Sequence, residues 1–589
     1  MSKLLSLCLV MLGLYSGLVY SETTKSSNTI GENVAVITEQ PLGRYPRWKA
    51  LVDEEDKLWL AYYRADEKLV IHRPDNSEII LNPIDRPNAF SGLAITPSSD
   101  GLSVMWRDKL PTKTLYFLPD ITLKKETSEP LIIDQDTEAL TRFSVVKDKG
   151  ETYFLWYGEK SHPGEKKYQL YFRYLGTDGQ SLSDTKMLMA GIYPAWIVDD
   201  DVIPVFSWVP EDDKRFSMAM RVFDRKTKEF GPFTKIAEAP PIGPFFFTLK
   251  SDKRWFLFWL GHYGDDGKQF LIEGVYSDDK GKGWQRFSLD SLKGFDLSDI
   301  QPAIDDSGNI LLVLSGRMSG AKNDIYFLRS TDNGTTWSEP KRPRPAEFRN
   351  TKADYPSVAF GSKPGTAMMV WEDWRNIRAN VYASYSTDSG ATWSDPAPLA
   401  SQGPANLTLS FDSENLFKGK NENYYLIARQ FTDDALINSK LVKYTLTSSW
   451  LQSLQDIEKN KMQTSKATEA RLRERVDSYW NAMKNDDYDT SYSLLDPFFR
   501  ARRPFKNYRM VMGKVGYYDF TIESIEKQGN IAKVKVVGEA SVHEMKLPSG
   551  EMYSAPKKKI SFTETWVFVD DDWYREYFEE MAGVRYTRY

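Results

Sequence analysis

A polar turn that recurs at a nearly constant interval constrains the fold of this chain more than any other feature. The stretches STDNGTTW (Ser330–Trp337) and STDSGATW (Ser386–Trp393) are almost identical, and a weaker copy, SDDKGKGW (Ser277–Trp284), precedes them. Their Asp residues are 53 and 56 positions apart. Each copy follows a short run of alternating apolar residues and precedes a polar extended segment, so each is predicted to be a turn between two strands.

The residue types of the repeat suit a tight turn. An Asp carboxylate accepts backbone N–H groups across such a turn, Gly adopts a positive φ that other residues resist, and Trp covers the turn with apolar surface. We therefore expect a structural role for these positions. The residues concerned are Asp279, Gly281, Trp284, Asp332, Gly334, Trp337, Asp388, Gly390 and Trp393.

This pattern resembles the Asp-box, also called the BNR repeat, of the sialidase-like β-propeller superfamily. The two later copies match Ser-x-Asp-x-Gly-x-Thr-Trp at every defined position, whereas the first has Gly283 where Thr is usual. The resemblance implies a mainly β fold whose blades are four-stranded sheets. It also implies that the Asp-boxes join the third and fourth strands of a blade, on the face opposite to the loops that bind ligands.

A second recurring pattern predicts the number of blades. Eight apolar runs lie between Trp59 and Ala428: LWLAYY, LSVMW, YFLWY, PVFSW, WFLFW, LLVLS, AMMVW and YYLIA. Spread over residues 35–448, they give roughly 52 residues a unit, a usual length for a four-stranded blade. We therefore expect seven or eight blades and not six. The segment NVAVITEQPL near the N-terminus is expected to complete the last blade, which removes two free sheet edges.

A change of composition after Trp450 predicts a second domain. Residues 449–467 are polar and rich in Lys and Gln, which is typical of a linker, and residues 468–589 open with helical spacing. The stretch YWNAMKNDDYDTSYSLLDPFFR resembles the opening of NTF2-like (SnoaL-like) domains. The resemblance implies an α+β cone with a pocket or a dimer face, so this domain is a candidate for homodimerisation. The apolar face of the first helix is predicted to contain Leu472, Val476, Tyr479, Trp480 and Met483.

The first 21 residues have the pattern of a signal peptide, with Lys3 before the apolar run LLSLCLVMLGL and a small-residue cleavage site at Ser21. No later stretch reaches twenty apolar residues, so we expect no membrane span and a secreted or periplasmic protein. The single cysteine, Cys8, lies in this segment, and the four histidines are far apart. We therefore expect no disulfide, metal or cofactor. A net charge of −5 gives no reason to expect nucleic acid as a partner.

Cationic side chains are predicted to gather on the face opposite to the Asp-boxes. They stand at the ends of second strands or in the loops between blades, and several guanidinium groups in one funnel would hold a carboxylate or another anion. The alternative is that each forms an ordinary ion pair between blades. The candidate ligand-binding residues are Arg44, Arg47, Arg107, His262, Arg317, Arg375 and Arg429.

The sialidase-like resemblance also implies a catalytic set, in which an arginine triad holds the substrate, a Glu activates a nucleophilic Tyr and an Asp transfers protons. Tyr355 and Glu372, predicted to share a blade, are the candidate nucleophile and its base, with Asp373 as a further carboxylate. The Arg-Ile-Pro motif of the sialidases is absent, and GRYPRW takes its place.

Three hypotheses follow from these patterns. The first is a secreted protein that binds an anionic glycan or a protein partner, and the second is a sialidase-type glycoside hydrolase. The third is a lyase or another enzyme on the same scaffold, with a Tyr or His262 as base.

Overall fold

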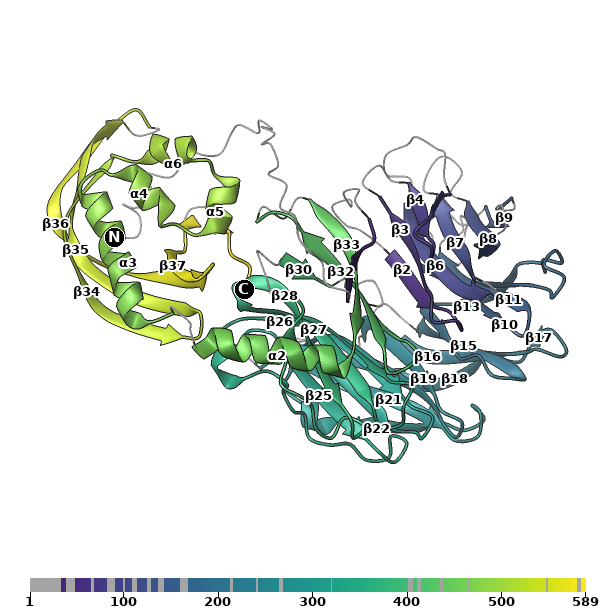
Figure 1. Ribbon diagram of the computed structural model, residues 1–589. Helices are drawn as coiled ribbons and strands as arrows, with labels where there is room; N and C mark the ends of the chain where they lie inside the picture. The colour runs from purple at the N-terminus through teal and green to yellow at the C-terminus, as the bar shows by residue number, and fades with distance from the viewer. Residues whose placement is uncertain are drawn as a thin grey trace.

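The computed structural model of the 589-residue chain (Figure 1) describes residues 33–38, 48–64, 68–81, 90–98, 101–108, 114–123, 129–135, 142–158, 168–211, 216–239, 242–263, 269–318, 320–400, 406–409, 415–434, 436, 438–463, 467–546, 549–579 and 584–589. The predicted signal peptide and the candidates Arg44 and Arg47 lie outside these ranges. No helix in the described ranges is long and apolar enough to cross a membrane.

The described strands between residues 34 and 446 form eight antiparallel sheets that follow one another along the chain. The first four contain β2 (Trp48–Val52), β3 (Leu58–Tyr63), β4 (Leu69–His72) and β5 (Glu78–Ile80); β6 (Phe90–Ser98), β7 (Gly101–Asp108), β8 (Leu115–Thr122) and β9 (Leu131–Asp134); β10 (Arg142–Asp148), β11 (Glu151–Gly158), β12 (Gln169–Leu175) and β13 (Lys186–Ala190); β14 (Ile192–Trp196), β15 (Val202–Pro210), β16 (Phe216–Asp224), β17 (Glu229–Phe230) and β18 (Thr234–Ala239).

The other four sheets complete the series. They contain β19 (Ile242–Lys250), β20 (Trp255–Tyr263), β21 (Gln269–Ser277) and β22 (Gln285–Ser288); β23 (Asp296–Ile304), β24 (Ile310–Arg317) and β25 (Asp324–Ser330); β26 (Ala353–Phe360), β27 (Ala367–Asn376), β28 (Arg378–Ser386) and β29 (Ala397–Pro398); β30 (Asn406–Thr408), β31 (Leu416–Lys418), β32 (Tyr424–Phe431), β33 (Ser439–Leu446) and β1 (Val34–Val36). Short 3-10 turns lie at Asp290–Leu292 and Ala346–Phe348.

The apolar runs of the sequence are buried because each second strand lies between two neighbouring sheets. In β27, Met368 and Val370 belong to the core shared with β32 and β33, whereas Met369 and Trp371 belong to the core shared with β24 and β25. Successive side chains therefore point to opposite neighbours, and both faces of the strand are apolar. The eight predicted second strands are confirmed as β3, β7, β11, β15, β20, β24, β27 and β32.

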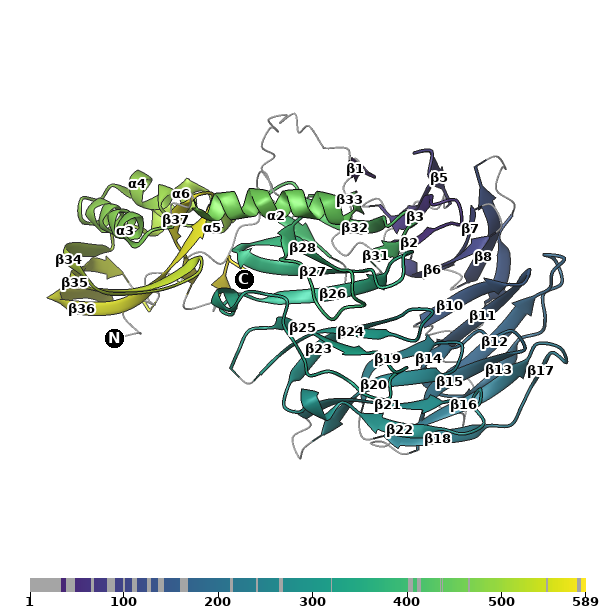
Figure 2. The same ribbon diagram turned by 60° about the horizontal axis from the view of Figure 1, so that its bottom comes forward.

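The N-terminal strand joins the last sheet, as predicted. β1 pairs antiparallel with β33, with Val34 opposite Tyr444 and Val36 opposite Val442. β31 of the same sheet contacts β2 of the first sheet on one side and β26 on the other. First and last sheets share an apolar core that includes Trp48 and Ile427. The series of sheets is therefore closed, and Figures 1 and 2 show the first strands beside β32 and β33.

The segment predicted to be a linker is instead a helix, α2 (Ser448–Gln463). Leu451 and Leu454 are buried in the core of the last sheets, and Gln455 Nε2 donates to Ser394 Oγ at 3.1 Å. The polar residues that resembled a linker form the solvated face of this amphipathic helix. In Figure 2, α2 leads from β33 to the C-terminal helices.

The C-terminal residues form helices on a four-stranded antiparallel sheet, and the predicted apolar face of the first helix is confirmed by the burial of all five residues. The helices are α3 (Glu469–Lys484), α4 (Tyr488–Ser493), α5 (Pro497–Arg502) and α6 (Phe505–Val511). The strands are β34 (Val515–Gln528), β35 (Ile531–Lys546), β36 (Met552–Val569) and β37 (Asp572–Arg575), with a separate pair, β38 (Phe578–Glu579) and β39 (Val584–Arg585).

Candidate functional site

The Asp-box turns lie where a third strand ends, and their polar groups bond to one another. Ser330 Oγ donates to Asp332 Oδ1 at 2.9 Å and accepts from the N–H of Gly334 at 2.8 Å. Thr336 donates its N–H to Asp332 Oδ1 at 2.9 Å and its hydroxyl to Asp332 Oδ2 at 2.6 Å. Because these groups satisfy each other, the turn stabilises the sheet and offers little to a ligand.

The opposite end of the same sheets carries a group of acidic side chains. Ala367, where β27 begins, pairs with Ser386 of the Asp-box, whereas Glu372 near the other end pairs with Asp354. Tyr355 follows Asp354 in β26, and Asp299 lies on β23, which contacts β26. We call Asp299, Asp354, Tyr355 and Glu372 the Tyr355 cluster.

Glu372 is buried between two sheets, with 3% of its surface exposed. Its carboxyl oxygens accept the indole N–H of Trp374 at 2.8 Å and the backbone N–H of Leu409 at 3.1 Å. Burial raises the pKa of Glu372 to about 7, and the nearby Lys352 ammonium opposes the shift. The carboxyl group is thus poised to gain or lose a proton near neutral pH.

Asp299 is the second carboxyl group with a pKa near neutrality. Burial, followed by the charge of Asp354, raises its pKa to about 7. Asp354 is itself bound, because Asn323 Nδ2 donates to its Oδ1 at 2.8 Å and Lys352 Nζ lies 3.7 Å from its Oδ2. The cluster therefore contains one carboxylate held by donors beside two carboxyl groups able to exchange protons.

Tyr355 is held in an unusual backbone conformation at the start of β26. Its φ is +54°, a value that bulky residues rarely adopt, and the pairing register shifts between Asp354 and Ser357. Burial and the charges of Glu372, Asp354 and Asp299 raise the pKa of its phenol to about 12. Tyr193, which also precedes a Pro at the start of a first strand, has the same conformation, with φ +51°.

Asp373 lies on the other face of β27 and is fully enclosed by donors. Arg344 reaches it through Nε at 2.9 Å and Nη2 at 3.1 Å, Arg375 through Nη2 at 2.7 Å, and Trp371 through Nε1 at 2.9 Å. Burial alone would raise its pKa, but the charges of Arg375 and Arg344 hold that pKa far below the ordinary value. Asp373 is thus an ionised anchor that does not share the environment of Glu372.

The candidate arginines do not meet in one described group. Arg375 is buried against Asp373 and lies 4.0 Å from the ring centroid of Tyr382, and half-exposed Arg317 pairs with Asp296 through Nη2 at 2.8 Å. Arg429 Nε donates to Ser439 Oγ at 2.7 Å. Burial lowers the pKa of Arg429 to about 10.

Arg107 and His262 belong to sheets at other positions of the series. The Arg107 side chain is 5% exposed, and burial lowers its pKa while the charge of Asp134 opposes the shift. His262 belongs to β20, and its side chain lies outside the described parts.

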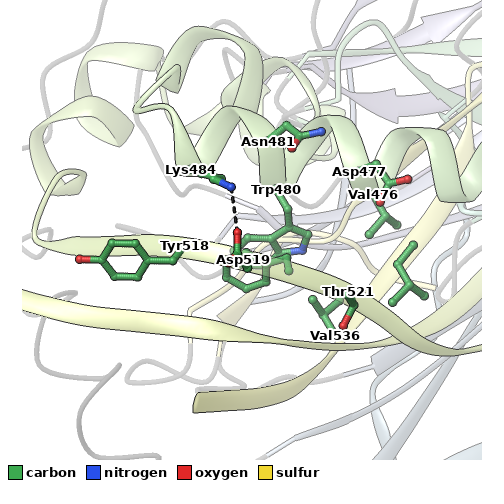
Figure 3. A pocket seen from close by; sticks show the side chains of 11 residues that line it. Val476, Asp477, Trp480, Asn481, Lys484, Tyr518, Asp519, Thr521 and Val536 are labelled. Atoms are coloured by element: carbon green, nitrogen blue, oxygen red, sulfur yellow. Dashed lines mark hydrogen bonds and ion pairs between the residues drawn. The ribbon is translucent and has the colours of Figure 1, made fainter. Parts of the chain in front are cut away.

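Two hollows lie away from the Tyr355 cluster. One of about 750 Å³ adjoins an Asp-box and is lined by residues that include Lys250, Arg254 and Lys280. The other, of about 130 Å³, lies between α3 and β34 in the C-terminal domain (Figure 3). There Lys484 Nζ lies 2.9 Å from Asp519 Oδ1. The charged groups of both hollows are largely paired within the protein.

From the sequence, Tyr355 was paired with Glu372, and Asp299 and Asp354 were missed. Asp354 stands two residues before the Pro of ADYPSV, and Asp299 stands three residues before the Pro of DIQPAI. An acidic residue shortly before the Pro of a first strand was the available signal.

Comparison with known proteins supports the repeat assignment. A family model described as a BNR repeat-like domain matches residues 212–425. No curated protein matches the sequence significantly. The fold is similar to a PL25 ulvan lyase bound to -[GlcA(1-4)Rha3S]-, with 12% identity, a TM-score of 0.40 and coverage of 61% of this chain and 94% of that chain.

The fold is also similar to a variant of the NanB sialidase from Streptococcus pneumoniae. The two share 10% identity with a TM-score of 0.31, over 71% of this chain and 95% of the other. The polysaccharide lyase Uly1 shares 9% identity with this chain at a TM-score of 0.39. The match covers 60% of this chain and 89% of the lyase. At these values none of the three structures transfers an activity or a residue role to this chain.

Proposed function

We propose that residues 34–446 form an eight-bladed β-propeller whose Tyr355 cluster cleaves glycosidic bonds in an extracellular glycan. The observation that carries the proposal is the placement of a strained Tyr beside one buried carboxyl group, Glu372, and one partly buried carboxyl group, Asp299, both with pKa values near 7. Perturbed carboxyl groups in a cluster with a strained residue are typical of catalytic sites. The closed order of the eight sheets supports the blade count.

Each member of the cluster has a role in this proposal. Tyr355 is the nucleophile, and its proton passes to ionised Glu372 as the phenol oxygen attacks the anomeric carbon, because a phenol with a raised pKa needs a base. Asp299 in its protonated form donates to the leaving glycosidic oxygen. Water then attacks the glycosyl–Tyr355 bond, Asp299 takes the water proton, and Glu372 returns a proton to the phenol oxygen.

The charges favour a glycan without a carboxylate at the cleaved sugar. Arg375 and Arg317 are paired with Asp373 and Asp296, so no described triad of guanidinium groups awaits a substrate carboxylate. The cluster itself carries three carboxyl groups, and one ammonium group, that of Lys352, lies beside it. A neutral sugar avoids their repulsion.

A second candidate function is binding without cleavage. Arg107 and Arg429 stand near the ends of second strands, and burial lowers the pKa of each guanidinium group. An anionic group of a glycan or protein partner that bound these guanidinium groups would raise their pKa values. In either function we propose that the chain is exported after loss of residues 1–21 and that residues 468–589 are an NTF2-like domain able to form homodimers.

The experiment is hydrolysis of fluorogenic neutral, uronic and sialic glycosides by residues 22–589. Tyr355→Phe and Glu372→Gln are expected to lose at least about a hundredfold in turnover, the usual loss when an essential proton-transfer group is removed. Tyr193→Phe is the matched control, because Tyr193 has the same strained conformation in another sheet.

Turnover of a neutral glycoside that is unchanged in Glu372→Gln would contradict the assignment. No turnover of any glycoside, with binding on a glycan array that is lost in Arg107→Gln or Arg429→Gln, would establish the second function instead.

A further inference from the structure

The C-terminal domain contacts the strand that carries Glu372. The hairpin between β27 and β28 enters the apolar core of that domain, where Trp374, Ile377 and Ala379 pack among its helices and strands. Asn530 of the C-terminal domain donates through Nδ2 to the carbonyl of Arg375 at 2.9 Å and to Asn376 Oδ1 at 3.1 Å. The tip of this hairpin is therefore shared between the two parts of the protein.

The hairpin is held in a conformation that it would not adopt alone. Ile377 has a φ of +67° although it is β-branched, and its side chain is fully buried. Such strain persists only where the surroundings fix the backbone. The C-terminal core and the two Asn530 hydrogen bonds supply those surroundings.

Trp374 connects this hairpin to the Tyr355 cluster. Its ring belongs to the C-terminal core, while its indole N–H donates to Glu372 Oε1 at 2.8 Å. The Lys352 ammonium lies 4.7 Å from the centroid of the same ring. One side chain thus touches both the C-terminal core and a carboxyl group of the candidate active site.

We propose that Trp374 is a positioning residue through which the C-terminal domain fixes the carboxyl group of Glu372. The catalytic meaning of this inference rests on the proposed function, but the hydrogen bond and its effect on Glu372 are measurable without a substrate. In this proposal the C-terminal domain is part of the candidate site, because it holds the residue that positions Glu372.

The direction of the effect follows from the groups around Glu372. Asp354 and Tyr355 face it from β26, the Lys352 ammonium lies in the segment before β26, and the Trp374 and Leu409 N–H groups bind its oxygens. A donor to a carboxylate stabilises the ionised form. Removal of the indole N–H alone is therefore expected to move the titration of Glu372 to higher pH.

The test is Trp374→Phe in the full chain, because Phe keeps an aromatic ring in the core and removes only the donor. The titration is followed by infrared difference spectroscopy on the protonated carboxyl band that disappears in Glu372→Gln. We expect an upward shift of about one pH unit. Trp371→Phe is the matched control, since it removes an indole donor from Asp373 at 2.9 Å on the other face of the same strand. It is expected to leave the band unmoved.

Asn530→Ala tests whether the C-terminal domain acts through Trp374. It is expected to shift the band in the same direction by a smaller amount, and to have no effect in the Trp374→Phe background. An unmoved band in Trp374→Phe, or equal effects of Asn530→Ala in both backgrounds, would overturn the inference. A shifted band in a protein that cleaves no glycoside would leave the positioning role intact and remove only the proposed function.

Discussion

Arg344 and Asp373 form a two-point ion pair in which neither side chain is exposed to solvent, with Nε and Nη2 at 2.9 and 3.1 Å from the two carboxylate oxygens. Arg344 Nη1 also binds Asp324 Oδ1 at 2.9 Å, which joins the sheet of β25 to that of β27. Arg344 therefore connects two consecutive sheets through buried ion pairs.

Removal of one partner from this pair is expected to be costly. Arg344→Met leaves the Asp373 and Asp324 carboxylates short of a buried donor, so we expect the free energy of unfolding to fall by about 3–5 kcal/mol. Urea denaturation measures the loss. Arg349→Met, at an exposed position nearby, is the control and is expected to change stability by less than about 0.5 kcal/mol. Equal effects of the two variants would contradict the structural role of the pair.

The Asp-box glycines differ from other glycines with positive φ in what surrounds them. A Cβ on Gly334 (φ +76°) would lie 2.6 Å from Phe256 Cε1, whereas one on Gly550 (φ +91°) would have no atom within 4 Å. Gly550→Ala is thus expected to lower the free energy of unfolding by about 1 kcal/mol through backbone strain alone. Gly334→Ala is expected to lower it by about 2–4 kcal/mol, because overpacking adds to the strain. Thermal unfolding compares the two, and a Gly334→Ala as stable as Gly550→Ala would contradict this packing.

Arg378 connects the C-terminal domain to the sheets. Its Nη2 lies 2.7 Å from Asp434 Oδ2 and 2.9 Å from Asp570 Oδ2. We expect calorimetry of Arg378→Met to show the C-terminal domain unfolding at lower temperature, separately from the sheets, because two carboxylates lose their shared partner. Arg473→Met, which breaks only a pair with Glu469 within α3, is the control. A single unshifted transition in Arg378→Met would argue against this coupling.

The raised pKa of Glu372 makes stability depend on pH in a defined window. The folded state binds this proton more tightly than the unfolded chain, so its contribution is complete below pH 4.5 and is lost as pH rises through about 7. Between pH 4.5 and about pH 7 we expect the free energy of unfolding of the wild type to fall by roughly 3 kcal/mol more than that of Glu372→Gln. Urea titrations at several pH values measure the difference. Glu544→Gln, at an exposed position, is expected to behave as wild type, and parallel curves for Glu372→Gln and wild type would contradict the shift.

The repetitive part of the fold was predictable because its causes are local. Second strands were recognised from apolar runs such as that ending at Trp371, and the closing strand at Val34–Val36 from its isolation in sequence. The polar segment that became α2 was not recognised, because its buried face depends on Leu451 and Leu454 meeting a sheet formed elsewhere.

The candidate site was predictable only in part. Tyr355 and Glu372 were paired because they share a sheet, but Asp299 joins them from the preceding sheet. The role of Asp373 depends on Arg344, which lies in an irregular segment before β26. The ion-pair partner of a charged residue at a strand end comes from a segment distant in sequence. Local sequence patterns therefore do not reveal it.

A crystal structure of Glu372→Gln with a glycoside that the wild type cleaves tests most directly whether the Tyr355 cluster is the active site. The proposed function requires that the glycosidic bond lies beside the Tyr355 hydroxyl and the Asp299 carboxyl group, at the end of β26 opposite to the Asp-boxes. A glycoside bound instead in the hollow near Lys250 and Arg254, or between α3 and β34, would contradict it.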